Sequence, residues 1–124
     1  MEREKNHVKG AILSASDAES IRRAGRIITS GGLVAFPTET VYGLGCDAMN
    51  AEAAAKVFEA KQRPQFDPLI VHIADLTQLE MVIASLPAVG QRLIDAFWPG
   101  PLTLVLPKQP AIPDLITAGR ATVA

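Results

Sequence analysis

Two cations beside a proline are the first candidates for chemistry in this sequence. Lys61 and Arg63 belong to the stretch KQRPQFDPLIVHI, where a helical pattern ends and an apolar run begins. Cations in the last turn of a helix are favourable by about 0.3 to 1 kcal/mol because of the helix dipole, so a purely structural role is one interpretation. An anion site is the other, because an arginine fork beside a flexible lysine suits a polyphosphate.

A loop with several hydroxyl groups is the second candidate. The stretch PTETVYGLGCDAMN follows the apolar run LVAF and supplies Thr38 and Tyr42, while Gly43 and Gly45 would allow close approach to the backbone. Ligands of open α/β sheets bind beyond the carboxyl ends of the strands, which favours a site here. The pattern fits a turn of small polar residues equally well, because it lacks the third glycine of a dinucleotide fingerprint and no P-loop motif occurs.

Three single residues have a structural interpretation beside a functional one. His72 interrupts the apolar run at residues 69–73 and is either a core histidine or a ligand-binding side chain. Trp98 in WPGP is interpreted as a core anchor. Cys46 is interpreted as a small packing residue, because a lone cysteine forms no internal disulfide and has no partners for a zinc site.

Composition excludes several classes of protein. The 124 residues carry a net charge of −1, so no global field draws the chain to nucleic acid or to a membrane surface. The start MEREKNHVK is followed by no apolar signal region, and no apolar run reaches the roughly 18 residues that a membrane span needs. We expect a cytoplasmic protein with no membrane partner. Because the last residues, ATVA, resemble an interrupted strand, we expect residues 1–124 to form a single, incomplete domain.

The elements that must position these residues alternate between strands and helices. Apolar runs predict strands at residues 11–13, 33–36, 69–73 and 102–106. Helix starts are signalled by the S-x-x-E spacing at Ser16 and by Asn50, Asp75 and Pro87, and stops by Gly31-Gly32, Pro64 and WPGP. This order indicates α/β layers around a largely parallel or mixed sheet.

Three of these stretches, taken together and in order, resemble one known family. GGLVAFPTETVYGLGCDA, KQRPQFDPLIVHI and FWPGPLTLVLP are similar to the amino-terminal part of the Sua5/YrdC/YciO family, the threonylcarbamoyl-AMP synthases. The resemblance covers about residues 12–124. It implies an α/β fold of the YrdC-like type, a twisted, mixed parallel and antiparallel sheet with flanking helices around a basic cavity.

The resemblance also implies a reaction. Family members are nucleotidyltransferases that convert L-threonine, bicarbonate and ATP, with Mg²⁺ on the phosphates, into threonylcarbamoyl-AMP and pyrophosphate. Partner proteins use this adenylate to make N6-threonylcarbamoyladenosine in tRNAs that read codons beginning with A. RNA contact by family members is a further implied property.

The same resemblance assigns six residues to two ligands and none to a protein-bound metal. Catalysis and ATP phosphate binding are assigned to Lys61 and Arg63, nucleotide contact to Thr122, and the threonine pocket to Thr38, Tyr42 and His72.

One departure leaves alternatives open. Members carry a downstream Ser-x-Asn motif that completes the nucleotide site, and this sequence does not contain it after Thr122. A double-stranded RNA-binding module, a YciO-like or carbamoyl-adenylate-forming relative, and an inactive fragment are the other interpretations. The balanced charge and few aromatic residues argue against the RNA-binding module.

Overall fold

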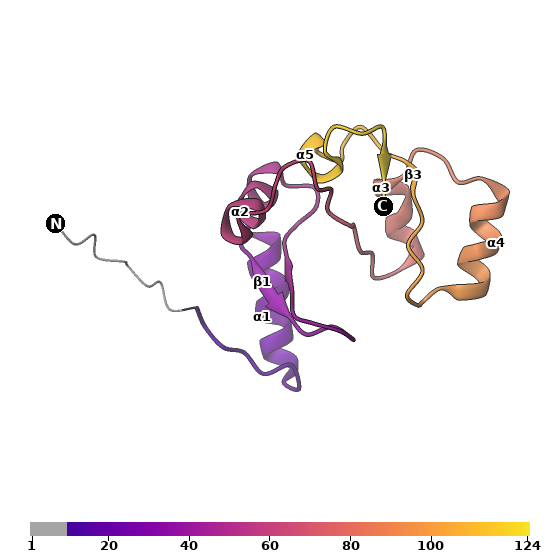
Figure 1. Ribbon diagram of the computed structural model, residues 1–124. Coiled ribbons are helices and arrows are strands. Elements are labelled where there is room, and N and C mark those ends of the chain that lie inside the picture. Colours follow the sequence, from indigo (N-terminus) through magenta and orange to yellow (C-terminus); the bar gives the residue numbers. More distant parts are fainter. Residues whose placement is uncertain (1–9) are drawn as a thin grey trace.

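The computed structural model describes residues 10–124, and Figure 1 shows its elements in chain order. Helix α1 (Ala18–Thr29) comes first, and the strand predicted at residues 11–13 is absent. Ile12 is 99% exposed, so this short apolar run has no burial to hold it as a strand. The charged start at residues 1–9 lies outside the described residues.

The N-terminal cap of α1 is Asp17, one residue after the predicted cap at Ser16. The Asp17 carboxylate accepts hydrogen bonds from the backbone N–H groups of Ser20 at 3.2 Å and Glu19 at 3.4 Å. Hydrogen bonds from the Ser20 hydroxyl and then from both backbone donors lower the pKa of Asp17. The carboxylate therefore satisfies two free donors of the first turn.

The predicted stop of α1 is confirmed at its glycine pair. Gly31 has a φ of 88°, the left-handed conformation that glycine adopts without steric cost. The Gly32 N–H donates to the Ile27 carbonyl at 2.8 Å, which closes the last turn. The chain then turns into β1 (Val34–Phe36), which pairs antiparallel with β2 (Gly43–Gly45). The prediction of a buried strand is half right, because Ala35 and Phe36 are exposed.

Helix α2 (Ala51–Lys61) is capped as predicted by Asn50, whose side chain accepts from the Ala53 N–H at 3.1 Å. Its buried face contains Ala53, Ala54, Val57 and Phe58. The helix ends at Gln62, which is left-handed with a φ of 50°. Helix α2 is thus an amphipathic helix whose C-terminus carries Lys61.

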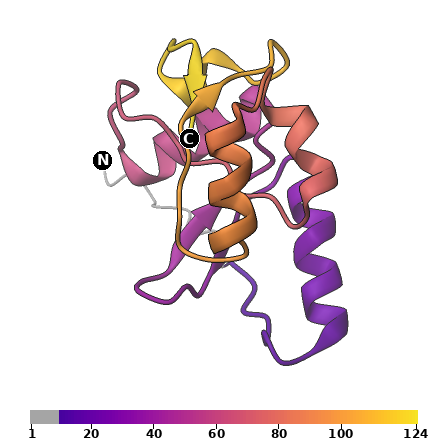
Figure 2. The ribbon, with the colours of Figure 1, turned by 90° about the vertical axis from the view of Figure 1, so that its right-hand side faces the viewer.

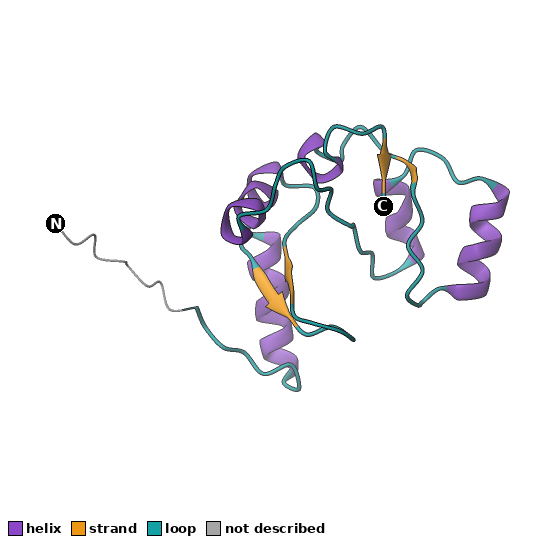
Figure 3. Cartoon of the chain, in the orientation of Figure 1, coloured by secondary structure: helices purple, strands orange, loops and turns teal. Residues whose placement is uncertain are grey.

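The apolar run at residues 69–73 is extended but forms no ladder in the described part of the chain, so the predicted strand is wrong there. Two backbone hydrogen bonds hold it, from the Leu69 N–H to the Ile116 carbonyl at 2.8 Å and from the Val71 N–H to the Ala124 carbonyl at 2.9 Å. Figure 3 shows this long loop segment between α2 and the next helices.

Short helices and a second ladder complete the chain. Asp75 caps, as predicted, the 3-10 helix η1 (Leu76–Gln78), which leads into α3 (Leu79–Val82). The remaining elements are α4 (Ala88–Phe97), which follows Pro87 as predicted, β3 (Leu106–Pro107), α5 (Asp114–Thr117) and β4 (Thr122–Val123). Strand β3 pairs antiparallel with β4, as expected for the last residues. Only the end of the strand predicted at residues 102–106 therefore finds a partner.

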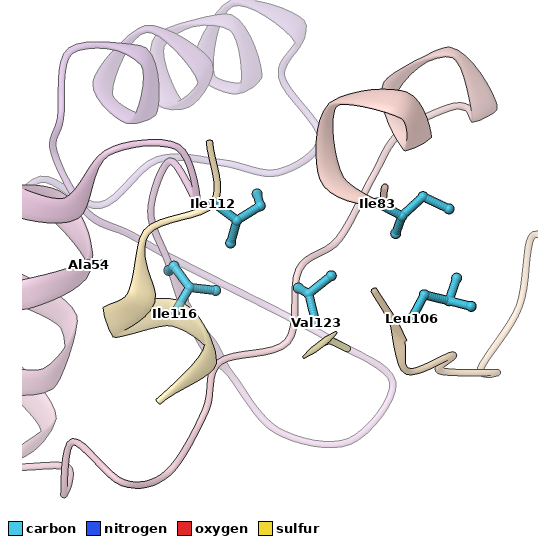
Figure 4. Close-up of a cluster of buried hydrophobic side chains, with 6 residues drawn as sticks. All are labelled: Ala54, Ile83, Leu106, Ile112, Ile116 and Val123. Atoms are coloured by element: carbon cyan, nitrogen blue, oxygen red, sulfur yellow. The ribbon is translucent and has the colours of Figure 1, made fainter. Parts of the chain in front are cut away.

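Helices and small sheets together confirm the α/β class. Both ladders of residues 10–124 are antiparallel and separate, so the parallel pairing of the predicted sheet does not occur in this part of the chain. Figure 1 places α1 and the β1–β2 hairpin at one end and α4 at the other. Figure 2, turned by 90°, shows α4 in front of the remaining elements. The main core is drawn in Figure 4 and consists of Ala54, Ile83, Leu106, Ile112, Ile116 and Val123.

Replacing the α1 cap tests the local assignment. We expect Asp17→Ala to lower the urea midpoint of unfolding, because two backbone donors of the first turn lose their acceptor. Ser16→Ala is the matched control, since the Ser16 hydroxyl contacts only the neighbouring Ser14 hydroxyl and its loss should change stability by less than about 0.5 kcal/mol. Urea denaturation of both variants measures the difference. An equal loss of stability in the two variants would contradict the assignment of Asp17 as the cap.

Candidate functional site

A hollow of about 660 Å³ brings together four of the six residues that the sequence indicated. These are Thr38, Lys61, Arg63 and His72. The β1–β2 hairpin lines one side, the end of α2 another, and the extended residues 68–73 a third. Residues separated by more than thirty positions in the sequence thus share one concave surface.

The cations at the end of α2 differ in how firmly they are held. Arg63 is half-buried and donates through Nη2 to the Pro68 carbonyl at 2.9 Å and through Nε to the Asp67 carbonyl at 3.4 Å. Lys61 is exposed. Among residues 10–124 neither forms an ion pair, and Asp47 is the one other charged side chain besides them on the hollow's lining. The lining therefore carries two positive charges and one carboxylate, and no ion pair joins them.

Thr38 stands where β1 leads into the hairpin loop. Its hydroxyl donates to the Val41 carbonyl and accepts from the Thr40 N–H at 3.3 Å. These bonds hold the loop in a local turn, as hydroxyl side chains commonly do. The Thr38 hydroxyl also lies 3.4 Å from the Thr40 hydroxyl, so a ligand that bound Thr38 would take the place of this contact.

His72 is exposed, which excludes the core-histidine interpretation. Exposure alternates along this segment: Ile70 and His72 are exposed, while Leu69, Val71 and Ile73 are half-buried. The ring Nδ1 lies 3.3 Å from the Ile70 carbonyl oxygen. The other ring nitrogen, Nε2, does not take part in this hydrogen bond. His72 lines the hollow with a side chain that can donate or accept.

Phe36 is a lining residue that sequence reasoning missed. Its ring lies against β2: a methyl group at Gly45 would be 2.6 Å from Cε1 of Phe36, and one at Gly43 would be 3.6 Å from the ring. The close approach that these glycines permit is therefore made by Phe36 and not by a ligand. A signal was present, because an aromatic residue followed by a G-x-G strand predicts such packing.

Cys46 lines the same hollow and confirms its interpretation as a packing residue. It is half-buried and packs against the core cluster. Burial, with a smaller effect of the Asp47 carboxylate, raises the pKa of the Cys46 thiol. The sulfur is thus held as a thiol at neutral pH, whereas nucleophilic cysteines have a lowered pKa.

Two indicated residues lie elsewhere. Tyr42 is 75% exposed on the hairpin and is absent from the lining of this hollow. Thr122 is exposed on β4, opposite Pro107, and also lies outside this hollow.

A second hollow of about 840 Å³ extends between residues 70–83 and the WPGP turn, and His72 lines both hollows. Trp98 lines that second hollow, and its Nε1 donates to the Leu102 carbonyl at 2.8 Å.

Residues 10–124 contain no group of three His, Cys, Asp or Glu side chains placed to hold a metal ion. Within the same residues, no helix is long and apolar enough to cross a membrane. Lys61 and Arg63, with hydrogen-bonding groups beside them, give the hollow the chemical means to bind an anion.

A family model matches residues 26–124, and its name and description are Sua5_yciO_yrdC, telomere recombination. The chain belongs to the Sua5/YciO/YrdC family. The match contains all six indicated residues and confirms the resemblance seen in the sequence.

Curated members of this family are similar over most of the chain. Threonylcarbamoyl-AMP synthase of Pyrococcus abyssi is 54% identical over 104 residues, which are 84% of this chain and 31% of the archaeal protein. Threonylcarbamoyl-AMP synthase of Bacillus subtilis is 50% identical over 113 residues, 90% of this chain and 32% of the relative. The chain thus spans about a third of the length of these Sua5/YciO/YrdC relatives.

Two solved structures show the same fold. P. abyssi Sua5 complexed with L-threonine matches with a TM-score of 0.83 at 49% identity, covering 90% of this chain and 33% of that protein. The solution structure of the MTH1692 protein from Methanobacterium thermoautotrophicum matches with a TM-score of 0.66 at 26% identity, covering 94% and 56%. The Sua5-like α/β fold of the described chain is therefore confirmed.

A single methyl group tests the role of the glycines. Gly45→Ala would bring Cβ to 2.6 Å from the Phe36 ring and displace it, and we expect a loss of about 1 kcal/mol because the half-exposed ring can turn aside. Gly43→Ala is the matched control, since its Cβ would meet the ring at an ordinary 3.6 Å. Urea denaturation and the NMR shifts of the Phe36 ring provide the comparison. Unchanged ring shifts in Gly45→Ala would contradict the packing.

Proposed function

We propose that this chain carries the part of a threonylcarbamoyl-AMP synthase site that binds the phosphates of ATP and the amino acid L-threonine. The observation that carries the proposal is the hollow in which Lys61 and Arg63, free of ion pairs in residues 10–124, meet Thr38 and His72. Curated relatives of this chain are threonylcarbamoyl-AMP synthases, and a structure of P. abyssi Sua5 is a complex with L-threonine.

Lys61 and Arg63 bind the phosphates of ATP. Their fixed positive charge stabilises the negative charge that develops on pyrophosphate as it leaves, which is the electrostatic help that phosphoryl chemistry needs. Arg63 is oriented by its bonds to the Asp67 and Pro68 carbonyls, and its remaining donors suit two phosphate oxygens. A magnesium ion would be held by the phosphate oxygens of ATP and would help to neutralise their charge.

Thr38 and His72 bind L-threonine. A hydroxyl and an imidazole can bind its hydroxyl, carboxylate or amine, and Phe36 offers an apolar surface beside them. In the proposed reaction the threonine amine takes up bicarbonate as a carbamate, with loss of water. A carbamate oxygen then attacks the α-phosphorus of ATP, the bond to the β-phosphate oxygen breaks, and threonylcarbamoyl-AMP and pyrophosphate are formed. Tyr42 and Thr122 stay proposed contacts of threonine and nucleotide.

Release of pyrophosphate tests the overall proposal. With ATP, Mg²⁺, bicarbonate and L-threonine we expect release that stops when threonine is left out. Release that requires carbamoyl phosphate in place of threonine would favour a carbamoyl-adenylate-forming enzyme. Release with neither donor would be cleavage of ATP alone and would contradict the proposal. The adenylate product would then pass to partner proteins of tRNA modification, and a steep salt dependence of RNA affinity would support an RNA partner as well.

Removing one cation tests the phosphate site. We expect Lys61→Ala to weaken ATP binding by about 10- to 100-fold, because a hydrogen bond to a charged group is lost, with little change in stability. Arg92→Ala on α4 is the matched control: it removes the same charge from an exposed position outside the hollow. Calorimetric titration with ATP·Mg²⁺ measures both. Equal affinities in Lys61→Ala and Arg92→Ala would remove Lys61 from the site.

Removing the imidazole separates the two ligands. We expect His72→Ala to weaken L-threonine binding about fivefold, the loss of one hydrogen bond, while ATP affinity changes less than twofold. The exposed position of His72 predicts an unchanged melting temperature. Titrations with each ligand alone measure the ratio of the two effects. An equal loss for ATP and threonine would place His72 outside the amino-acid pocket.

A further inference from the structure

The residue between the two cations has an unusual backbone. Among residues 10–124 only Gln62 and Ala118 have positive φ without being glycine, at 50° and 52°. L-amino acids rarely adopt this left-handed conformation, because Cβ approaches the following carbonyl oxygen. The Gln62 side chain is exposed and does not line the hollow, so what Gln62 contributes there comes from its backbone.

Hydrogen bonds hold this conformation at the end of α2. The Gln62 N–H donates to the Glu59 carbonyl at 3.2 Å, and the Arg63 N–H turns back to the Phe58 carbonyl at 2.9 Å. The two bonds form the pattern that closes a helix with one left-handed residue. Arg63 consequently leaves the helix axis, and its guanidinium reaches the Asp67 and Pro68 carbonyls.

The turn determines whether the two cations can face the same ligand. In a continuing α-helix, residues two positions apart point about 200° apart around the axis, so Lys61 and Arg63 would lie on opposite sides. In the structure both line the same hollow. The left-handed conformation of Gln62 is where the chain departs from helical geometry. This departure brings the two cations to the same side.

We propose that Gln62 is a positioning residue, whose left-handed backbone directs Lys61 and Arg63 onto one polyphosphate. This inference rests on the proposed ATP site. A residue that shifts the turn toward the right-handed region lowers the fraction of molecules with both cations in place, and the apparent ATP affinity falls by that fraction. Glycine, and to a lesser degree asparagine, adopt the left-handed conformation readily, whereas β-branched valine does not.

Substitutions at Gln62, with Ala118 as the control position, test the proposal. We expect Gln62→Gly and Gln62→Asn to bind ATP·Mg²⁺ at least as tightly as the parent, and Gln62→Val to bind about tenfold more weakly. L-Threonine affinity should change less than twofold in all three. Ala118→Val places the same strain at the end of α5, on a residue that lines neither hollow, and should lower the melting temperature without changing ATP affinity.

Calorimetric titrations and melting curves of the five proteins distinguish the outcomes. Weaker binding in Gln62→Gly and Gln62→Asn would mean that the amide side chain itself contacts the ligand, which overturns a backbone role. Equal ATP affinities in the parent and Gln62→Val would overturn this inference and leave the ATP site standing. A folded parent that binds no ATP would overturn the proposed function, and this inference with it.

Discussion

The packing of α2 against α5 is the contact on which the rest of the structure depends. Ala53 and Ala54 are fully buried, so α2 approaches its neighbours closely, and Ala54 belongs to the same core cluster as Ile112 and Ile116 (Figure 4). This packing fixes the C-terminus of α2 in space. It also anchors the extended residues 69–73, since the Leu69 N–H donates to the Ile116 carbonyl. The cations and His72 are therefore positioned by one small core.

A helix C-terminus is an unusual place to bind phosphate. Helix N-termini and P-loops offer backbone N–H donors to an anion, whereas a C-terminus presents carbonyl oxygens and a negative dipole end. Charge for an anion must therefore come from side chains. The chain turns at Gln62, where backbone N–H groups donate to the carbonyls of residues 58 and 59. The Arg63 guanidinium then donates to the Asp67 and Pro68 carbonyls, which fix its position.

Local signals made the helices predictable, and the lack of long-range signals limited the rest. Asn50, Asp75 and Pro87 mark helix starts through bonds or constraints within a few residues, so α2, η1 and α4 follow from the sequence. A strand needs a partner distant in the sequence, and apolar character alone does not provide one. The runs at residues 11–13 and 69–73 are therefore not strands in the described chain, while the glycine-rich β2 is one. At the site, residue types were enough to identify Thr38, Lys61, Arg63 and His72. The turn at Gln62 was not predicted because no glycine marks it. Phe36 was missed because it lines the hollow only through its packing against β2.

The central claim is that one hollow binds ATP phosphates and L-threonine together. Isothermal titration of the 124-residue chain with ATP·Mg²⁺ and bicarbonate, with and without L-threonine, tests it most directly. The account predicts binding of ATP that tightens when threonine is present, because both ligands occupy one surface. A chain with a folded circular-dichroism spectrum that binds no ATP, or binds it equally with and without threonine, would contradict the claim.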